Sequence, residues 1–245
     1  MAEQGQGSGE SGGRAQGRAV TRAEWLEARK AVLAQEKLLT RMRDEVTRAR
    51  RALPWVRVEA PYTFQGPDGE ETLEQLFAGR SQLIVYHFMF DPSWDEGCRS
   101  CSFLSDHYDG AVVHLAQRDV TMVAVSRAPL EKLRAFRARM GWRFKWVSSF
   151  GTRFNHDFQV TFTDDDRARG EIDYNYGKAR FFSPEAPGLS VFARDERGVF
   201  HTYSTYARGL DRFITAYHLL DVVPRGRDED GLGYSMAWLK LHDAY

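Results

Sequence analysis

The sequence SQLIVYHFMFDPSWDEGCRSCSFLSDHYDG, residues 81–110, joins a nearly unbroken apolar run to the two cysteines of a 245-residue chain. An apolar run of β-branched and aromatic residues such as 81–90 is typical of a strand buried on both faces. The following stretch, 98–117, is predicted as a helix that carries Cys101 on its inward apolar face. We therefore expect Cys98 and Cys101 to lie where a central strand passes into a helix.

The elements that follow extend this unit into an α/β fold. A buried strand is predicted at 120–126, a helix at 128–141 and a further strand at 142–149. Alternating strands and helices favour parallel pairing through right-handed crossovers. The segment 189–205 then reads as an antiparallel hairpin around Asp-Glu-Arg-Gly, and 209–221 as a last amphipathic helix. The predicted fold class is α/β, with a mixed sheet flanked by helices.

Composition divides the chain into three parts. Residues 1–19 are rich in Gly, Ser and Gln, have little to bury, and are predicted to form a disordered tail. Residues 20–54 are predicted as an N-terminal helix, and residues 55–245 as the main domain. Within that domain, the polar segment 163–188 is expected to be an inserted surface loop.

The N-terminal helix is predicted to begin at a capping box formed by Thr21 and Glu24 and to end before Pro54. Apolar residues recur on it every three or four positions, with a gap at Gln35. They are Trp25, Ala28, Val32, Leu39, Met42, Val46 and Ala49. Such a stripe needs a partner, either the main domain or a second copy of the chain. A homodimer through this helix is therefore among the expected assemblies.

The composition narrows the expected partners. Formal net charge is zero, so no global field favours nucleic acid or an acidic partner, and we expect neither nucleic acid nor a membrane as a partner. No run of 18 apolar residues predicts a transmembrane helix, and the N-terminus has no apolar region typical of a secretory signal. A cytoplasmic location is therefore expected, where disulfides are mostly transient and catalytic. The expected partner is a protein or small-molecule thiol or disulfide.

The two cysteines are expected to have different chemistry. A helix N-terminus favours an anion, so Cys98 should form a thiolate readily, and the neighbouring Arg99 should lower its pKa further. Burial should keep Cys101 protonated until a mixed disulfide forms. We therefore assign attack on a substrate disulfide to Cys98 and resolution to Cys101.

Two other uses of the cysteine pair compete with this one. A zinc site would need histidine ligands as well, and the nearest are His87, His107 and His114. Two inert core thiols are the other alternative, although the polar loop before Cys98 argues against burial of both. Haem attachment would need histidine where the chain has Ser102. We predict neither a metal nor a cofactor.

Four longer stretches carry a resemblance to a known family. They are LIVYHFMF, GCRSCSFLSDHYDG, VAVSRAPLEKLRAFRARMGWRFKWVSSFGTRFNHDF and SVFARDERGVFHTYSTYARGLDRF. Together they look like a bacterial family of thioredoxin-like proteins, catalogued as a domain of unknown function and often labelled predicted dithiol–disulfide oxidoreductase. The resemblance spans roughly residues 20–245. It implies a thioredoxin-like fold and a dithiol activity at Cys98 and Cys101.

The resemblance also implies neighbours for this pair. Thioredoxin-like folds usually carry a cis-proline opposite the cysteines, and Pro187 fits by order, with Pro184 as the competitor. Trp94 stands roughly where such sites carry a tryptophan, either as a docking surface or as ordinary loop packing. Together with Arg99, Trp94 and Pro187 are the candidate active-site neighbours. Ordinary thioredoxin has Trp-Cys-Gly-Pro-Cys where this chain has Gly-Cys-Arg-Ser-Cys, a departure that argues against general thioredoxin-type reductase activity.

Two further functions stay open. A thiol peroxidase of the peroxiredoxin-like type is indicated by the hairpin and short helix over 63–77, which are like those of peroxiredoxin-type chains. Against it, a Thr-x-x-Cys motif is missing, since Asp95 stands where threonine is needed. The other alternative is a redox-sensing binding module without turnover.

Overall fold

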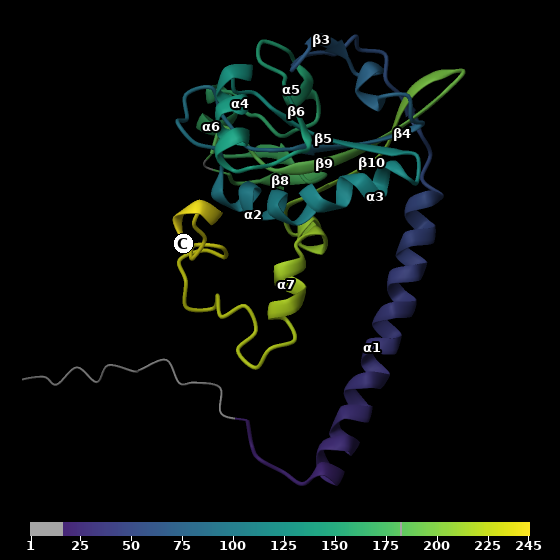
Figure 1. The fold of residues 1–245 in the computed structure, drawn as a ribbon, viewed down its shortest axis with the longest axis vertical. Coiled ribbons are helices and arrows are strands. Elements are labelled where there is room, and N and C mark those ends of the chain that lie inside the picture. The colour runs from purple at the N-terminus through teal and green to yellow at the C-terminus, as the bar shows by residue number, and fades with distance from the viewer. Residues whose placement is uncertain (1–16, 182) are drawn as a thin grey trace, which may run out of the picture.

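The computed structural model describes residues 17–181 and 183–245, so most of the predicted disordered tail lies outside the described residues. The centre of the molecule is an eight-stranded mixed sheet (Figure 1). Its strands are β1 (Val56–Arg57), β2 (Thr63–Gly66), β3 (Gly69–Thr72), β4 (Gln82–His87), β5 (Val120–Ser126), β6 (Lys145–Ser148), β9 (Gly188–Asp195) and β10 (Gly198–Tyr206). They lie in the order β1-β10-β9-β4-β5-β6-β2-β3.

The middle of this sheet confirms the predicted α/β order. Strand β4 pairs in parallel with β5, and β5 in parallel with β6, while β9 runs antiparallel to β4 and forms a hairpin with β10. The crossovers contain α2 (Arg99–Tyr108), α3 (Val112–Ala116) and α4 (Leu130–Arg139). A mixed sheet flanked by helices is therefore the architecture of the chain.

Successive side chains of β4 serve two different cores, because a strand alternates its side chains between the two faces of a sheet. Leu83 and Val85 belong to one apolar cluster, which includes Phe154 of the short helix α5 (Phe154–Asp157). Tyr86 belongs to the other cluster, which also contains Cys101 of α2. The sheet therefore positions the cysteine pair on the face toward which Tyr86 points.

Two predicted helices are interrupted in the structure. The helix expected over 98–117 is divided by a 3₁₀ turn at Asp109–Ala111, which contains Gly110, a residue that disfavours helix interiors. The helix expected over 209–221 is a 3₁₀ helix, Ala207–Phe213, followed by α7 (Thr215–Leu220). Ile214 between them has an extended backbone, which ends one helix before the next begins.

The segment 163–188 has more regular structure than a polar surface loop. It contains α6 (Asp164–Ala168) and a hairpin of β7 (Ile172–Tyr174) and β8 (Gly177–Ala179). Ile172 and Tyr174 are buried in a third small cluster with Phe162 and Tyr206. This segment therefore folds onto the end of the β9–β10 hairpin.

The predicted N-terminal helix is confirmed as α1 (Arg22–Arg51), and Thr21 and Glu24 form the predicted capping box. No residue of α1 is buried, and the helix extends away from the rest of the molecule (Figure 1). None of the helices within the described residues is both long enough and apolar enough to cross a membrane.

Candidate active site

Cys98 is the N-cap of α2 and lies at the end of the loop that follows β4. Its backbone N–H donates to the carbonyl of Met89 at 3.1 Å, which ties the start of the helix to the end of the strand. Gly97 makes this approach feasible, because a Cβ at this position would lie 2.7 Å from the ring of Phe88 and 2.9 Å from that of Phe136. The cysteine pair is therefore held at the strand-to-helix junction that its sequence position indicated.

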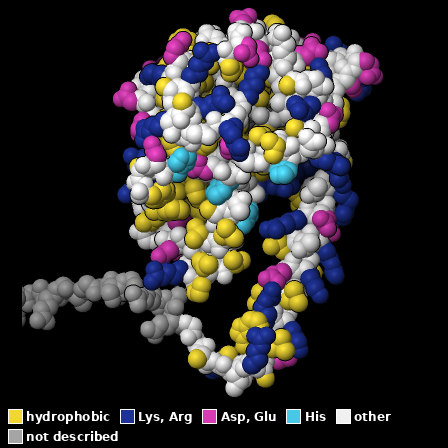
Figure 2. Space-filling model, viewed as in Figure 1, with side chains coloured by type: hydrophobic (Ala, Val, Ile, Leu, Met, Phe, Trp, Pro, Cys, Tyr) yellow, Lys and Arg dark blue, Asp and Glu magenta, His cyan; other side chains and the backbone are white. Residues whose placement is uncertain are grey.

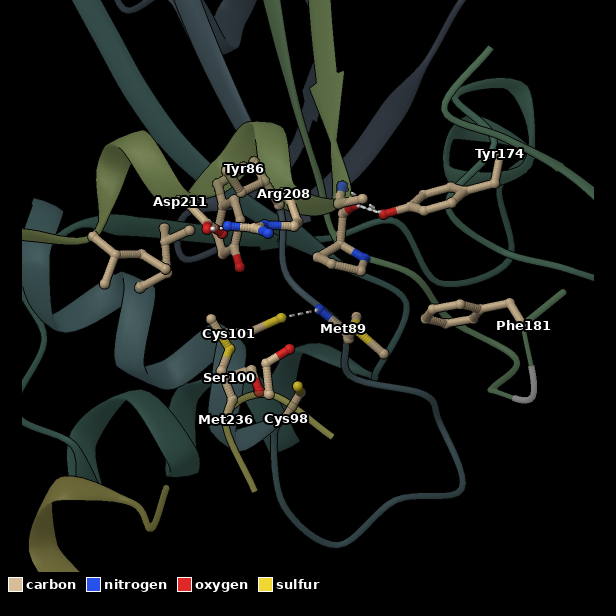
Figure 3. Close-up of a pocket in the computed structure, with 16 residues that line it drawn as sticks. Tyr86, Met89, Cys98, Ser100, Cys101, Tyr174, Phe181, Arg208, Asp211 and Met236 are labelled. Atoms are coloured by element: carbon tan, nitrogen blue, oxygen red, sulfur yellow. Dashed lines mark hydrogen bonds and ion pairs between the residues drawn. The ribbon is translucent and has the colours of Figure 1, made fainter. Parts of the chain in front are cut away.

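The two cysteines differ in exposure as predicted. Both are free thiols; Cys98 is partly exposed, while Cys101 is 1% exposed. The backbone N–H of Met89 donates to the Cys101 sulfur at 3.4 Å (Figure 3). Cys98 thus keeps part of its surface in solvent, whereas Cys101 is buried with its sulfur held by a backbone amide.

This difference extends to their acidity. The pKa of Cys98 is lowered to about 7, mainly because the Cys101 thiol donates a hydrogen bond to its sulfur, and further through the backbone N–H groups of Cys101 and Ser100. The pKa of Cys101 is raised well above its usual value by burial and by its contact with Cys98. The N-terminal amides of α2 supply the stabilisation that we assigned to the helix end, while the strongest contribution comes from the second cysteine.

The alkylation rate of Cys98 provides a direct test of this arrangement. With iodoacetamide, the rate is expected to rise with pH around a midpoint near 7, because the thiolate is the nucleophile. In the Cys101→Ser variant the midpoint should move upward, because the substitution removes the Cys101 thiol, which is the largest cause of the lowered Cys98 pKa. A midpoint near the ordinary value of about 8.5 in the unmodified protein would contradict the assignment.

A cavity of about 380 Å³ opens beside both sulfurs (Figure 3). It is mostly apolar, and its walls come from β4, α2, the segment before β9, the 3₁₀ helix after β10 and the C-terminal segment. The lining residues are Tyr86, Met89, Cys98, Ser100, Cys101, Leu104, Tyr174, Phe181, Pro187, Ala207, Arg208, Leu210, Asp211, Ile214, Ser235 and Met236. A volume of this size suits a small organic molecule or a single large side chain.

Of the three candidate active-site neighbours, Pro187 lines the cavity, whereas Trp94 and Arg99 do not. The Pro187 carbonyl accepts a hydrogen bond from the Tyr174 hydroxyl at 2.7 Å. The expected cis geometry at Pro187 is wrong, because no peptide bond within the described residues is cis. Trp94 packs against the core cluster, and its carbonyl accepts from Lys132. Arg99 lines a separate hollow near the C-terminus.

Tyr86 is a site residue that sequence reasoning missed. Its side chain lines the same cavity as Cys101, and burial, followed by the charge of an ionised Cys101, raises the Tyr86 pKa well above its usual value. In the sequence Tyr86 stands inside an apolar run, where nothing separates it from a core aromatic. Arg208 and Met236 also line the cavity, but they lie far from the cysteines along the chain, and no sequence pattern indicated that they belong to the site.

His87 follows Tyr86 and lies on the opposite side of the sheet. Its Nε2 is 2.8 Å from the Ser190 hydroxyl, and its ring stacks on Phe154 and Phe158. Burial lowers its pKa to about 3. Across the described part of the chain, no group of three or more His, Cys, Asp or Glu side chains is placed to hold a metal ion.

The sheet order and the cysteine pair at the β4–α2 junction define a thioredoxin-like α/β protein. The family model "Bacterial protein of unknown function (DUF899)" matches residues 15–245, and the chain belongs to this family. No curated protein matches the chain.

Solved structures with a similar fold include a peroxiredoxin, a peroxidoxin and a putative thiol:disulfide interchange protein. A mutant of peroxiredoxin Q from Xanthomonas campestris is 14% identical, with 64% of this chain and 90% of that chain covered and a TM-score of 0.42. Peroxidoxin BcpB from Mycobacterium tuberculosis is 13% identical, with 66% and 93% covered and a TM-score of 0.44. A putative thiol:disulfide interchange protein DsbE from Chlorobium tepidum is 13% identical, with 67% and 98% covered and a TM-score of 0.41.

Proposed function

We propose that this protein is a dithiol–disulfide oxidoreductase in which Cys98 attacks and Cys101 resolves. One observation carries the proposal: a partly exposed thiol lies at a helix N-cap beside a buried thiol, an environment that lowers the pKa of the first and raises the pKa of the second. Thiol exchange needs this difference in pKa. The attacking sulfur must be a thiolate at neutral pH, and the resolving sulfur must stay protonated until the mixed disulfide has formed. The cavity beside both sulfurs offers space for the substrate.

The exchange proceeds in two balanced steps. The Cys98 thiolate attacks one sulfur of a substrate disulfide, and the other substrate sulfur leaves as a thiolate that takes up a proton. Cys101 then loses its proton and attacks the Cys98 sulfur, which releases the second substrate thiol. The substrate gains two electrons, and the protein is left with a Cys98–Cys101 disulfide. The reverse sequence oxidises a substrate dithiol.

Tyr86 and the Met89 amide are suited to the second step. The Met89 amide donates to the Cys101 sulfur, and the Tyr86 hydroxyl lowers the Cys101 pKa against the effect of burial, so both can stabilise the thiolate that forms there when the mixed disulfide is resolved. We expect Tyr86→Phe to slow resolution about tenfold, in line with the loss of one hydrogen bond to a charged group, and to leave the first attack nearly unchanged. Acid-quenched time courses of the mixed disulfide measure the two steps separately.

Tyr174→Phe is the matched control for this variant, because its hydroxyl lies on the same cavity and donates to Pro187. This control should leave the resolution rate of the mixed disulfide unchanged. Equal slowing in both variants would show that general loosening of the cavity, and not the contact with Cys101, controls the step.

Quantitative thiol labelling across a redox titration tests the proposed function itself. Cys98 and Cys101 should be labelled together under reducing conditions and protected together under oxidising ones, with a single midpoint for a two-electron couple. The proposal fails if no disulfide forms between them at any potential. Peroxide consumption that depends on Cys98, measured on the same sample, would instead identify a thiol peroxidase.

A further inference from the structure

Over most of its length, helix α1 has no partner within the described part of its own chain; its last turn contacts the main domain through Arg50, which lies over the ring of Tyr203. It is 30 residues long, or about 45 Å at the usual rise, and none of its residues is buried. It leaves the body at Ala52–Trp55, just before β1, and stands clear of the other helices in Figure 1. Figure 2 shows apolar and basic side chains exposed along it. A helix of this length is stable in water mainly through packing of its apolar side, so this side requires a cover.

The apolar side of α1 follows a strict seven-residue repeat. Alternating steps of three and four residues connect eight positions without a break, and Gln35 occupies the one polar position in the row. In heptad notation, the a positions are Trp25, Val32, Leu39 and Val46, and the d positions are Ala28, Gln35, Met42 and Ala49. Leu39 is 51% exposed and Met42 is 56% exposed. This pattern is the signature of a helix that supercoils with a second helix.

The charges beside this seam select a parallel arrangement. In a parallel pair, each g position faces the e position five residues later in the other helix. This places Glu24 opposite Arg29 of the second copy and Glu45 opposite Arg50 of the second copy. An antiparallel pair would place the mostly basic e row against itself and the acidic g residues against each other, which is repulsive. Two pairs of opposite charge on each side of the coiled-coil seam therefore support the parallel orientation.

Gln35 and the valines favour the same state. In a parallel pair in register, each d-position Gln35 meets its own copy and the two amides can satisfy one another, whereas an antiparallel pair would leave the amide against Leu39. β-branched residues at the a position, here Val32 and Val46, favour two strands. The valines at the a positions, the charges beside the seam and the Gln35 amides thus all favour pairing of α1 with a second copy of the same helix.

We propose that α1 is a dimerisation element that pairs with α1 of a second copy as a parallel, in-register, two-stranded coiled coil. The inference is independent of the cysteine chemistry, since it rests on residues 22–51 alone. Both main domains then lie at the same end of the coiled coil, where Arg50 rests over the ring of Tyr203 at 5.5 Å in each copy.

Sedimentation equilibrium of the full chain tests the assembly. The unmodified protein should sediment at twice the monomer mass at micromolar concentration. Leu39→Glu, which places a charge in the middle of the seam, should raise the dimer dissociation constant by roughly 100-fold or more. Ala34→Glu adds the same charge on the outer face, at a c position, and should have little effect. A monomer at about 100 μM for the unmodified chain would overturn the proposal.

Disulfide cross-linking then tests orientation and register. In a Cys98→Ser, Cys101→Ser background, Ala28→Cys should form a disulfide-linked dimer on mild oxidation, because a parallel pair in register brings position 28 against itself. Ala34→Cys, on the outer face, should remain a free thiol. No cross-link for Ala28→Cys alone, but one when it is mixed with Val46→Cys, would show an antiparallel pair and refute the proposal.

Discussion

The Cys98→Ser substitution is expected to lower the rate of thiol–disulfide exchange by about 10³-fold or more. The serine hydroxyl is not ionised at neutral pH, and the remaining thiol, Cys101, is 1% exposed with a pKa raised well above its usual value. No second nucleophile therefore substitutes for the lost sulfur. Reduction of a chromogenic aromatic disulfide, followed under pseudo-first-order conditions, measures the loss.

Cys101→Ser is the matched control, since it removes the other sulfur and should give a different result. The Cys98 thiolate can still attack, so one substrate equivalent should be released and a mixed disulfide should accumulate. Intact-mass spectrometry would detect the adduct. Comparable loss of the first substrate equivalent in both variants would refute the assignment of Cys98 as the attacking residue.

Arg127→Met is expected to destabilise the protein by about 3–5 kcal/mol, the range for breaking a buried ion pair from one side. Arg127 donates through Nε to Glu185 at 2.6 Å and through its terminal nitrogen to Asp91 at 2.6 Å. Glu185 is 1% exposed and Asp91 is 8% exposed. This guanidinium is the main compensation for the burial of Glu185, while Asp91 also accepts two hydrogen bonds from Ser93. Urea denaturation at pH 8 measures the change.

Arg139→Met provides the control for this prediction. Arg139 also pairs with two carboxylates, Glu96 and Asp243, but all three side chains are substantially exposed. Exposed pairs contribute about 1 kcal/mol or less. A loss of stability for Arg127→Met no larger than for Arg139→Met would mean that the buried carboxylates do not depend on Arg127.

The loss caused by Arg127→Met should depend on pH. Burial raises the Glu185 pKa to about 7, above its ordinary value of 4.5, so the folded state binds this proton more tightly than the unfolded state. The unfavourable effect of the ionised carboxylate on stability is therefore absent below about pH 4.5 and complete above about pH 7. Without Arg127 this effect grows, and the variant should lose less stability at pH 5 than at pH 8.

This ion-pair network also connects the two segments that border the cysteine site. Asp91 follows β4 in the loop that leads to Cys98, and Glu185 lies two residues before Pro187 on the opposite wall of the cavity. Arg127 follows β5 and holds both. Loss of Arg127 should therefore affect the relative placement of the two walls as well as stability.

The interior strands and the unequal cysteines could be predicted because their causes are local. Residues 83–90 are apolar except for His87, and such a run of β-branched and aromatic residues is typical of a strand buried on both faces. Cys101 shares a helical face with apolar residues, so its burial follows from the 3.6-residue period. The apolar stripe of α1 is also local, and the helix predicted over 20–54 was found at Arg22–Arg51.

Tertiary structure alone decided what surrounds the cysteines. Tyr86 contacts Cys101 because β4 presents alternate residues to opposite faces and α2 packs over one of them; the neighbouring His87 points away for the same reason. The cavity is also lined by residues more than 80 positions from the cysteines along the chain, namely Pro187, Arg208 and Met236. A local sequence pattern does not show which distant segments come into contact in the fold. The sequence by itself determined the interior strands, the position of the cysteine pair at a strand-to-helix junction and the unequal burial of the two cysteines, since these depend on periodicity and position. The cavity, the trans geometry at Pro187 and the Asp91–Arg127–Glu185 network depended on long-range packing, where distances are set by the whole fold.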